Sequence, residues 1–308
     1  MQVTHDTSRP LTGRTVLVTG AGKGLGAAFA RALGRAGANV VVNNRIKDGA
    51  EDEASAVAAD IRAEGGQAVA EHSDVTDPGA PAAMLAAAMD TFGSLDGIVC
   101  NAGTSGPARR FGEGSTEIVR SVLETNFFSI VSLMETCQPA LEASGSGRVL
   151  MIASSAGLYG LKGRPAYAAS KGALNGFALS LADEWRGRIG VNVLCPYAAT
   201  RMTGPEPAAE DADGPMSPDN IALPAVWLTS PECDRTGEIW LGGGRWLRRV
   251  HIVETEGARI PDTLDGFDAF ADSQSGLDTA RGFTGAEAAF ADFFKTLTAK
   301  SGAPETTG

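Results

Sequence analysis

The sequence is poor in cysteine and histidine, and it has no long apolar run. Its 308 residues include four cysteines and three histidines. The cysteines are far apart and form no C-x-x-C pair, so they predict buried thiols in a reducing cytoplasm rather than disulfides. The histidines show no ligand-like spacing, so we expect no metal site. No apolar run reaches the roughly 20 residues that a bilayer-spanning helix needs.

Positive charge is also scarce. Lys and Arg number 26 against 37 Asp and Glu, which leaves a net charge of −11 at pH 7. This balance argues against nucleic acid or an anionic membrane as a partner. The first ten residues are polar and lack the apolar segment of a signal peptide, so we expect a cytoplasmic protein. Aromatic residues make up 6%, but the hydrophobic fraction of 43% suffices for a core.

Short apolar runs alternate with longer segments of helical periodicity. The runs are apolar throughout, as a parallel sheet covered by helices on both faces requires. The alternation therefore predicts an α/β fold with a doubly wound parallel sheet. The expected strands are 15–18, 39–42, 68–70, 97–100, 148–152, 191–194 and 238–241, and the expected helices are 24–36, 50–64, 81–92, 115–142, 166–185 and 218–228.

Two segments break this rhythm, one inside the expected domain over 11–244 and one that forms a C-terminal extension over 245–308. Residues 203–218 are rich in Pro, Asp, Glu and Gly, so we expect a loop, placed where a lid would be. The extension contains a weakly amphipathic stretch at 285–299. Helical periodicity does not distinguish a tail packed on its own subunit from a helix docked on a partner. The last residues, 301–308, are expected to be disordered.

A glycine-rich turn follows the first expected strand. Gly20 comes directly after the strand, and Gly24 and Gly26 open the next helix, with Lys23 and Leu25 among them. Glycine lets the backbone turn tightly and approach a pyrophosphate, and the helix N-terminus offers N–H groups and a positive dipole end. The turn predicts a dinucleotide site.

The end of the second strand bears on which dinucleotide fits. An acidic residue there would bind the adenosine ribose hydroxyls and repel a 2′-phosphate. This strand instead ends Asn43-Asn44-Arg45, without a carboxylate. Arg45 and Lys23 are suited to pair with a 2′-phosphate, so the sequence favours NADP(H) over NAD(H). The alternative is that both are solvated surface charges.

Further candidates follow the third and fourth strands. The Asp74 carboxylate, beside Val75, is placed to accept a hydrogen bond from the adenine amino group. The small turn Asn101-Ala102-Gly103 would let backbone lie against the cofactor. Either segment alone could be an ordinary turn, but their placement at successive strand ends favours a cofactor role.

Tyr167 and Lys171 carry the chemistry. Residues four apart share a helix face, and an ammonium lowers the pKa of a phenol from its ordinary value of about 10. Tyr167 would exchange a proton with a carbonyl or alcohol oxygen while hydride moves at carbon, and Lys171 would also reach the nicotinamide ribose. Ser154 would hold the substrate oxygen, with Ser155 as a competitor for this role. Asn126 would anchor a water that links Lys171 to solvent.

Together these motifs resemble the short-chain dehydrogenase/reductase family over about residues 11 to 244. The matching motifs are T-G-x-x-x-G-x-G at 19–26, N-A-G at 101–103, and Asn126 with Ser154, Tyr167 and Lys171. The resemblance implies a seven-stranded Rossmann fold, a nicotinamide cofactor, an Asn-Ser-Tyr-Lys tetrad, and a homodimer or homotetramer. Cys195-Pro196-Tyr197 stands where many members have P-G. Thr200 and Met202 resemble the segment that contacts the nicotinamide amide.

A weaker resemblance rests on Thr200-Arg201-Met202-Thr203, Gly242-Gly243-Gly244 and the long tail. It points to the dehydrogenase part of the multifunctional β-oxidation enzymes and to related hydroxyacyl and hydroxysteroid dehydrogenases. We therefore expect an NAD(P)(H)-dependent oxidoreductase that interconverts a secondary alcohol and a ketone on a fairly large apolar substrate, such as a hydroxyacyl thioester, steroid or terpenoid. One alternative is a non-catalytic dinucleotide sensor or scaffold, which would be expected to lose a member of the tetrad. Another is a dehydratase or epimerase, whose glycine spacing usually differs.

Overall fold

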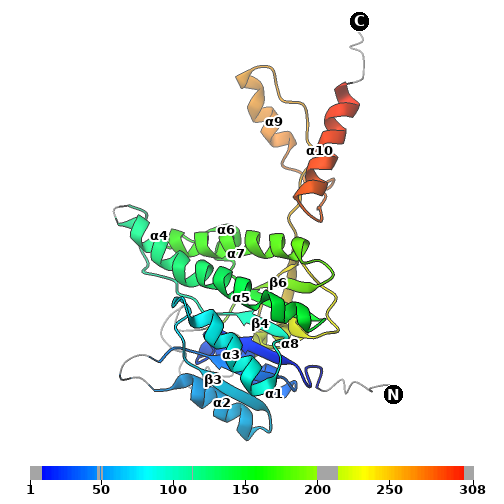
Figure 1. Cartoon of the computed structure of the whole chain (residues 1–308). Coiled ribbons are helices and arrows are strands. Elements are labelled where there is room, and N and C mark those ends of the chain that lie inside the picture. Colours follow the sequence, from blue (N-terminus) through cyan, green and yellow to red (C-terminus); the bar gives the residue numbers. More distant parts are fainter. Residues whose placement is uncertain (1–8, 47–48, 50, 113, 200–213, 302–308) are drawn as a thin grey trace, which may run out of the picture. The chain divides into compact units, whose positions relative to one another are not determined.

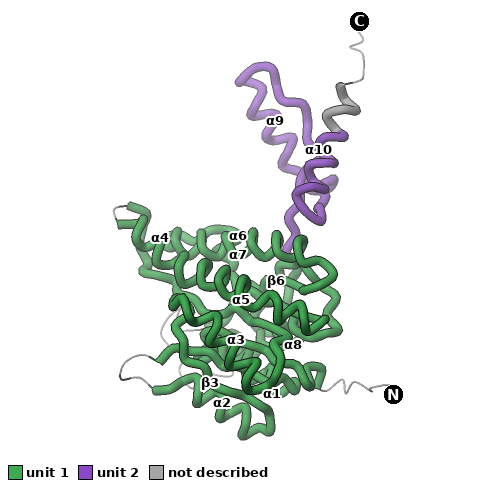
Figure 2. Tube along the Cα trace, viewed as in Figure 1, with its two compact units in different colours: residues 1–249 green, residues 250–308 purple. Residues whose placement is uncertain are grey.

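A computed structural model of the chain describes residues 9–46, 49, 51–112, 114–199 and 214–301. The chain divides into two compact units, residues 1–249 and 250–308 (Figure 2). The first unit is built on one eight-stranded sheet. Its strands are β1 (Thr15–Val18), β2 (Asn39–Asn43), β3 (Gln67–Glu71), β4 (Gly97–Cys100), β5 (Gly147–Ile152), β6 (Ile189–Pro196), β7 (Ile239–Gly243) and β8 (Trp246–Val250).

The strand order is β3-β2-β1-β4-β5-β6-β7-β8, and every pair from β3 to β7 is parallel. Figure 1 labels β3, β4 and β6 of this sheet. The order reverses between β1 and β4, where Val16 pairs with Val40 on one side and Gly97 on the other. This reversal opens a crevice at the carboxyl ends of the strands. The prediction of a doubly wound parallel sheet is confirmed.

Helices cover both faces of the sheet. On one face α1 packs against both α2 and α8, and on the other α3 packs on α5 while α4 packs on α7. The helices are α1 (Gly24–Arg35), α2 (Glu53–Ala63), α3 (Ala80–Phe92), α4 (Ser115–Leu123), η1 (Glu124–Phe128), α5 (Ser129–Ala143), α6 (Ala156–Tyr159), α7 (Pro165–Glu184), η3 (Pro218–Ile221) and α8 (Leu223–Thr229).

The apolar strands are buried because both faces of the sheet are covered. Every residue of β1 and β4 is buried, so neither strand needs a polar face. Phe29 and Leu33 of α1 enter the same core as Val40 and Val42 of β2. Residues suited to turns lie where helices end. For example, Gly93 ends α3 with a φ of 81°, which a residue with a side chain rarely adopts.

The structure adds an eighth strand to the seven that the sequence predicted. Two residues join β7 to β8, a connection that only antiparallel strands permit. Both Gly244 and Arg245 have positive φ, 55° and 69°, as a type I′ hairpin turn requires. The strand Trp246–Val250 is partly exposed at the sheet edge and contains two arginines, so it lacks the continuous apolar run of its neighbours.

The long helix expected at 115–142 is interrupted. A π-helical turn, η1, separates α4 from α5 and contains Asn126. Such turns hold one extra residue and occur frequently at functional sites. The proposed lid at 203–218 lies largely outside the described residues, as do 302–308.

The second unit contains η4 (Leu264–Gly266), α9 (Phe267–Ser273) and α10 (Ala286–Ser301). The amphipathic stretch at 285–299 corresponds to α10, whose Phe290, Phe293 and Phe294 are exposed. Within this unit, Arg281 forms an ion pair with Asp292 at 3.0 Å. In neither unit does a described helix combine the length and apolarity needed to cross a membrane.

Candidate active site

One large cleft collects the candidate residues at the carboxyl ends of the strands. Its volume is about 1490 Å³. A single drug-sized ligand typically occupies about 300–1,000 Å³, so this cleft has room for a dinucleotide beside a second molecule. The sequence-predicted residues that line it are Gly20, Lys23, Gly24, Leu25, Gly26, Asn44, Arg45, Asp74, Val75, Asn101, Ala102, Gly103, Ser154, Tyr167 and Lys171. Thr200 and Met202 lie outside the described residues.

The glycine turn is packed too tightly for side chains. A Cβ on Gly26 would lie 2.2 Å from the Gly20 carbonyl oxygen, and one on Gly20 would lie 2.8 Å from Ala102 Cα. Asn101 Nδ2 donates hydrogen bonds to the carbonyls of Thr19 and Gly20, both at 3.0 Å. The Thr19 hydroxyl accepts from the backbone N–H groups of Asn101 and Ala102, at 3.0 and 3.1 Å. Thr19, absent from our candidates, thus joins the β1 turn to the β4 loop.

The start of α1 fits a pyrophosphate. Its N-cap residue, Lys23, makes no side-chain capping hydrogen bond, and no acidic residue lies in the first turn. Gly24, Leu25 and Gly26 of this turn line the cleft. Backbone N–H groups without a side-chain cap, at the positive end of a helix dipole, suit an anion. The residues present therefore fit a dinucleotide.

Both cations that the sequence assigned to a 2′-phosphate are already paired with carboxylates. Lys23 forms an ion pair with Glu53, which also accepts from Asn44 Nδ2 at 3.3 Å. Arg45 forms an ion pair with Asp74. All of these side chains line the cleft. Glu53, in the first turn of α2, was absent from our candidates because its position near Lys23 depends on how α2 packs against α1.

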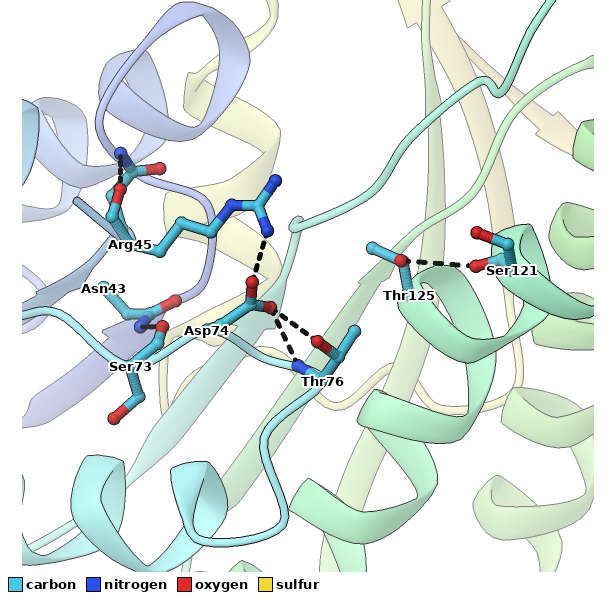
Figure 3. A network of polar contacts seen from close by, with 8 residues as sticks. Asn43, Arg45, Ser73, Asp74, Thr76, Ser121 and Thr125 are labelled. Carbon is cyan, nitrogen blue, oxygen red and sulfur yellow. Dashed lines mark hydrogen bonds and ion pairs between the residues drawn. The ribbon is translucent and has the colours of Figure 1, made fainter. Parts of the chain in front are cut away.

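Asp74 is held in its ionised form. Although burial acts to raise the pKa of its carboxyl, hydrogen bonds from Thr76 and Arg45 hold that pKa below its ordinary value. Thr76 donates from its backbone N–H at 3.0 Å and from its hydroxyl at 2.8 Å. Figure 3 shows Arg45 facing Asp74 on one side and Thr76 facing it on the other. Asp74 is therefore a fixed acceptor on the cleft wall.

Asn43 is a third residue that our sequence reasoning missed. Its side chain is buried, and Nδ2 donates to Glu71 Oε2 at 2.6 Å. Nδ2 also donates to the Ser73 carbonyl at 3.0 Å (Figure 3). It ties the end of β2 to the segment after β3. The sequence signal for this role was an asparagine directly after three valines of a buried strand. A polar side chain at such a position needs hydrogen-bond partners.

Tyr167 and Lys171 lie one turn apart near the start of α7, which Pro165 opens at a position where its missing N–H is harmless. The Lys171 ammonium is buried, donates to the Ile152 carbonyl at 2.7 Å, and lies 5.9 Å from the centre of the Tyr167 ring. Burial lowers the pKa of Lys171 to about 8. The Ser154 side chain hydrogen-bonds with the Tyr167 phenol.

The expectation that Lys171 lowers the pKa of Tyr167 is wrong for this structure. Burial raises the pKa of the phenol, and the hydrogen bond with Ser154 and the charge of Arg164 only partly offset it. The Lys171 ammonium bonds to a backbone carbonyl of β5 rather than to the phenol, which is the physical reason. Tyr167 therefore keeps its proton at neutral pH and is suited to be a proton donor.

Asn126 is fully buried in the π-helical turn and does not line the cleft. Its Oδ1 accepts from the Thr104 N–H at 2.7 Å, and its Nδ2 donates to the Thr104 carbonyl at 2.8 Å and to Ser170 Oγ at 2.9 Å. Both amide hydrogens are thus used, so a water could bind only at Oδ1. A Cβ on Gly103 would approach Asn126 Oδ1 to 3.1 Å and Lys171 Nζ to 3.6 Å, so both atoms face one spot. The expected water stays a prediction.

The cysteines Cys100, Cys137, Cys195 and Cys233 are free and buried, which confirms their assignment as buried thiols. Burial raises the pKa of Cys137 and of Cys195 to about 12, so both stay protonated. Among the described residues, no three His, Cys, Asp or Glu side chains gather as a metal site would require.

Known proteins match this chain over most of its length. The family model for short chain dehydrogenase matches residues 14–211. A short-chain type dehydrogenase/reductase of Mycobacterium tuberculosis is 34% identical over 80% of this chain and 88% of its own length. A short chain dehydrogenase structure from Mycobacterium avium, 33% identical, covers 88% of this chain and 97% of its own with a TM-score of 0.75.

The weaker resemblance is also supported. Peroxisomal multifunctional enzyme type 2 of Mus musculus is 33% identical over 80% of this chain. The match spans 34% of the mouse enzyme's length. The structure of the Drosophila melanogaster enzyme of this name is 25% identical, covers 94% of this chain and 50% of its own, and gives a TM-score of 0.76.

Proposed function

The chain belongs to the short-chain dehydrogenase family, and from this premise we propose that it transfers hydride between a nicotinamide dinucleotide and a secondary alcohol or its ketone. The observation that carries the proposal is one cleft that joins the glycine turn of β1–α1 to Ser154 and Tyr167. A dinucleotide held at the turn would extend toward the phenol, where a second molecule has room.

A nicotinamide bound in this cleft would supply the hydride to the substrate carbon or accept it from there. For ketone reduction, Tyr167 donates its phenolic proton to the carbonyl oxygen, so the product is a neutral alcohol. Ser154, which hydrogen-bonds with the phenol, orients that oxygen. Lys171 keeps its ammonium buried, 5.9 Å from the centre of the Tyr167 ring, where it would reach the nicotinamide ribose hydroxyls. Asn126 positions the β4 loop against α7.

The substrate that we propose is fairly large and apolar over much of its length, of the hydroxyacyl thioester, steroid or terpenoid type. The size of the cleft supports this. A non-catalytic sensor or scaffold is less favoured, because Ser154, Tyr167 and Lys171 meet in the cleft with Asn126 behind them. We also propose a cytoplasmic homodimer or homotetramer.

The purified protein should oxidise NADPH or NADH in the presence of at least one ketone from a panel of acyl thioesters, steroids and terpenoids. The dinucleotide's absorbance reports the rate, and dinucleotide fluorescence reports binding without turnover. Binding of the dinucleotide with no oxidation by any member of the panel would favour the sensor over the enzyme.

We propose NADP(H) as the preferred dinucleotide, since Lys23 and Arg45 line the cleft and no acid ends β2. Replacing Arg45 with Gln should raise the KM for NADPH by about 10- to 100-fold, because a hydrogen bond to a charged group contributes about 1.5–3 kcal/mol. The KM for NADH, which has no 2′-phosphate, should change little.

The matched variant is Glu53→Gln. Glu53 holds Lys23 in an ion pair, so its neutralisation should free the ammonium and lower the KM for NADPH. Steady-state kinetics with both dinucleotides measure the two variants side by side. A wild-type preference for NADH, or equal effects of Arg45→Gln on both dinucleotides, would contradict the proposed preference.

A further inference from the structure

Four cations gather on two loops beside the catalytic end of the cleft, in a chain whose net charge is −11. Arg109 and Arg110 follow β4, and Lys162 and Arg164 precede α7. Within the described part of the chain, none of the four forms an ion pair. This contrasts with Lys23 and Arg45, which both have carboxylate partners.

The two loops are bonded to each other through these residues. Arg164 Nη1 donates to the Gly106 carbonyl at 2.9 Å and to the Ser105 carbonyl at 3.5 Å. In return, the Arg109 backbone N–H donates to the Gly163 carbonyl at 2.7 Å. The Arg164 guanidinium is therefore held in place, with N–H groups beyond those of Nη1 left for another acceptor.

Arg164 connects two hollows in the surface. It lines the main cleft together with Tyr167, and it also lines a small pocket beside it. Arg109 and Arg110 line this second pocket, and Ser105 is shared by both. The positive charge of Arg164 reaches the phenol, because it acts to lower the pKa of Tyr167. Arg164 and Ser105 thus link the surface that Arg109 and Arg110 line to the cleft that contains Tyr167.

We propose that Arg109, Arg110 and Arg164 bind an anionic group of the substrate, a phosphate or a carboxylate, while its carbonyl lies at Tyr167. This inference rests on the proposed function and narrows the substrate to an amphipathic carbonyl compound with a negative charge away from the reacting carbon. Guanidinium groups suit this role because their planar donors match carboxylate and phosphate oxygens two at a time.

The cofactor's own phosphates do not account for these arginines. The start of α1 fits the pyrophosphate, and Lys23 and Arg45 lie at the ribose end. Arg109 and Arg110 do not line the part of the cleft that these elements form. A second anion, from the substrate, explains why cations without carboxylate partners surround the small pocket.

The test compares substrates that share a reacting group. The first pair is acetoacetyl-coenzyme A, which carries phosphates, and the neutral acetoacetyl thioester of N-acetylcysteamine. The second pair is 4-oxopentanoate, which carries a carboxylate, and its neutral methyl ester. The wild type should have a higher kcat/KM for the charged member of one pair. In Arg164→Gln and in the double variant Arg109→Gln/Arg110→Gln, that ratio should fall by about 10- to 100-fold. The substrate pair whose kcat/KM ratio falls in the variants shows whether the site prefers a phosphate or a carboxylate.

Arg120→Gln is the matched control, since Arg120 is exposed on α4 and lines neither pocket. It should leave both ratios at the wild-type value. Ratios that stay unchanged in the Arg109, Arg110 and Arg164 variants would overturn the inference, even if the enzyme reduces neutral ketones.

Calorimetric titration separates this inference from the proposed function. If no ketone is reduced, acetoacetyl-coenzyme A and 4-oxopentanoate can still be titrated into the protein. Binding of either to the wild type, weakened about tenfold or more in the arginine variants, would support an anion site. Absence of binding, or equal binding to wild type and variants, would refute it.

Discussion

Tyr167→Phe is expected to lower kcat by about 10²- to 10⁴-fold, the usual contribution of a general acid or base. The change removes one oxygen and keeps the ring that packs above Lys171. Dinucleotide affinity should stay unchanged, because the glycine turn and the cations near β2 are not altered. Rates of NAD(P)H oxidation and dinucleotide fluorescence titrations measure the two quantities separately.

Tyr197→Phe is the matched control. Tyr197 also lines the cleft, but it is 42% exposed and follows β6 rather than lying on α7. Its loss should change kcat by much less than the loss of Tyr167. Turnover of Tyr167→Phe close to that of the wild type would remove this phenol from the mechanism, and an equally large loss in Tyr197→Phe would reassign the proton donor.

Gly157→Ala is expected to destabilise the protein by about 1–3 kcal/mol, the usual cost of overpacking a tight contact. A Cβ at this position would lie 2.5 Å from the Lys171 carbonyl carbon and 2.7 Å from the Gly172 nitrogen. Both atoms are backbone of α7, so α6 must move away from it. Since Ser154 Oγ accepts from the Ala156 N–H, this movement also displaces Ser154.

Misplacement of catalytic groups by about 1 Å can cost up to about 10²-fold in rate, so kcat should fall together with stability. Gly176→Ala, in the same helix α7, is the control because a Cβ there meets nothing within 4 Å. It should stabilise the protein by about 0.5–1 kcal/mol through helix propensity. Urea unfolding and kinetics test both variants. A neutral Gly157→Ala would show that α6 can shift freely.

Much of the sheet was predictable because seven of its strands are short, largely apolar runs in the sequence. Runs such as Val16-Leu17-Val18 and Ile98-Val99-Cys100 are apolar on both faces, which parallel strands between two helical layers require. β8 was not predicted because an exposed edge strand lacks a continuous apolar run. The π-helical turn at Asn126 was not predicted either, because one inserted residue does not remove the helical periodicity around it.

The site was predictable where spacing alone brings groups together, as for Tyr167 and Lys171 on one helix. It was not predictable where distant elements decide the neighbours. The partners of Lys23 and Arg45 come from α2 and from the segment after β3, and they convert two lone cations into two ion pairs. The direction of the Tyr167 pKa depends on burial and on where the Lys171 ammonium bonds, and a motif records neither.

The hairpin between β7 and β8 also limits how copies of this chain can associate. With β8 in place, the backbone N–H and C=O groups of β7 are no longer at the rim of the sheet. The new rim is five residues long and carries Arg248, Arg249 and an exposed Trp246. Short, charged rims resist continuous strand pairing between molecules. An assembly that used this side would therefore join through side chains, with the indole ring as its apolar anchor, and not as one sheet running through both molecules.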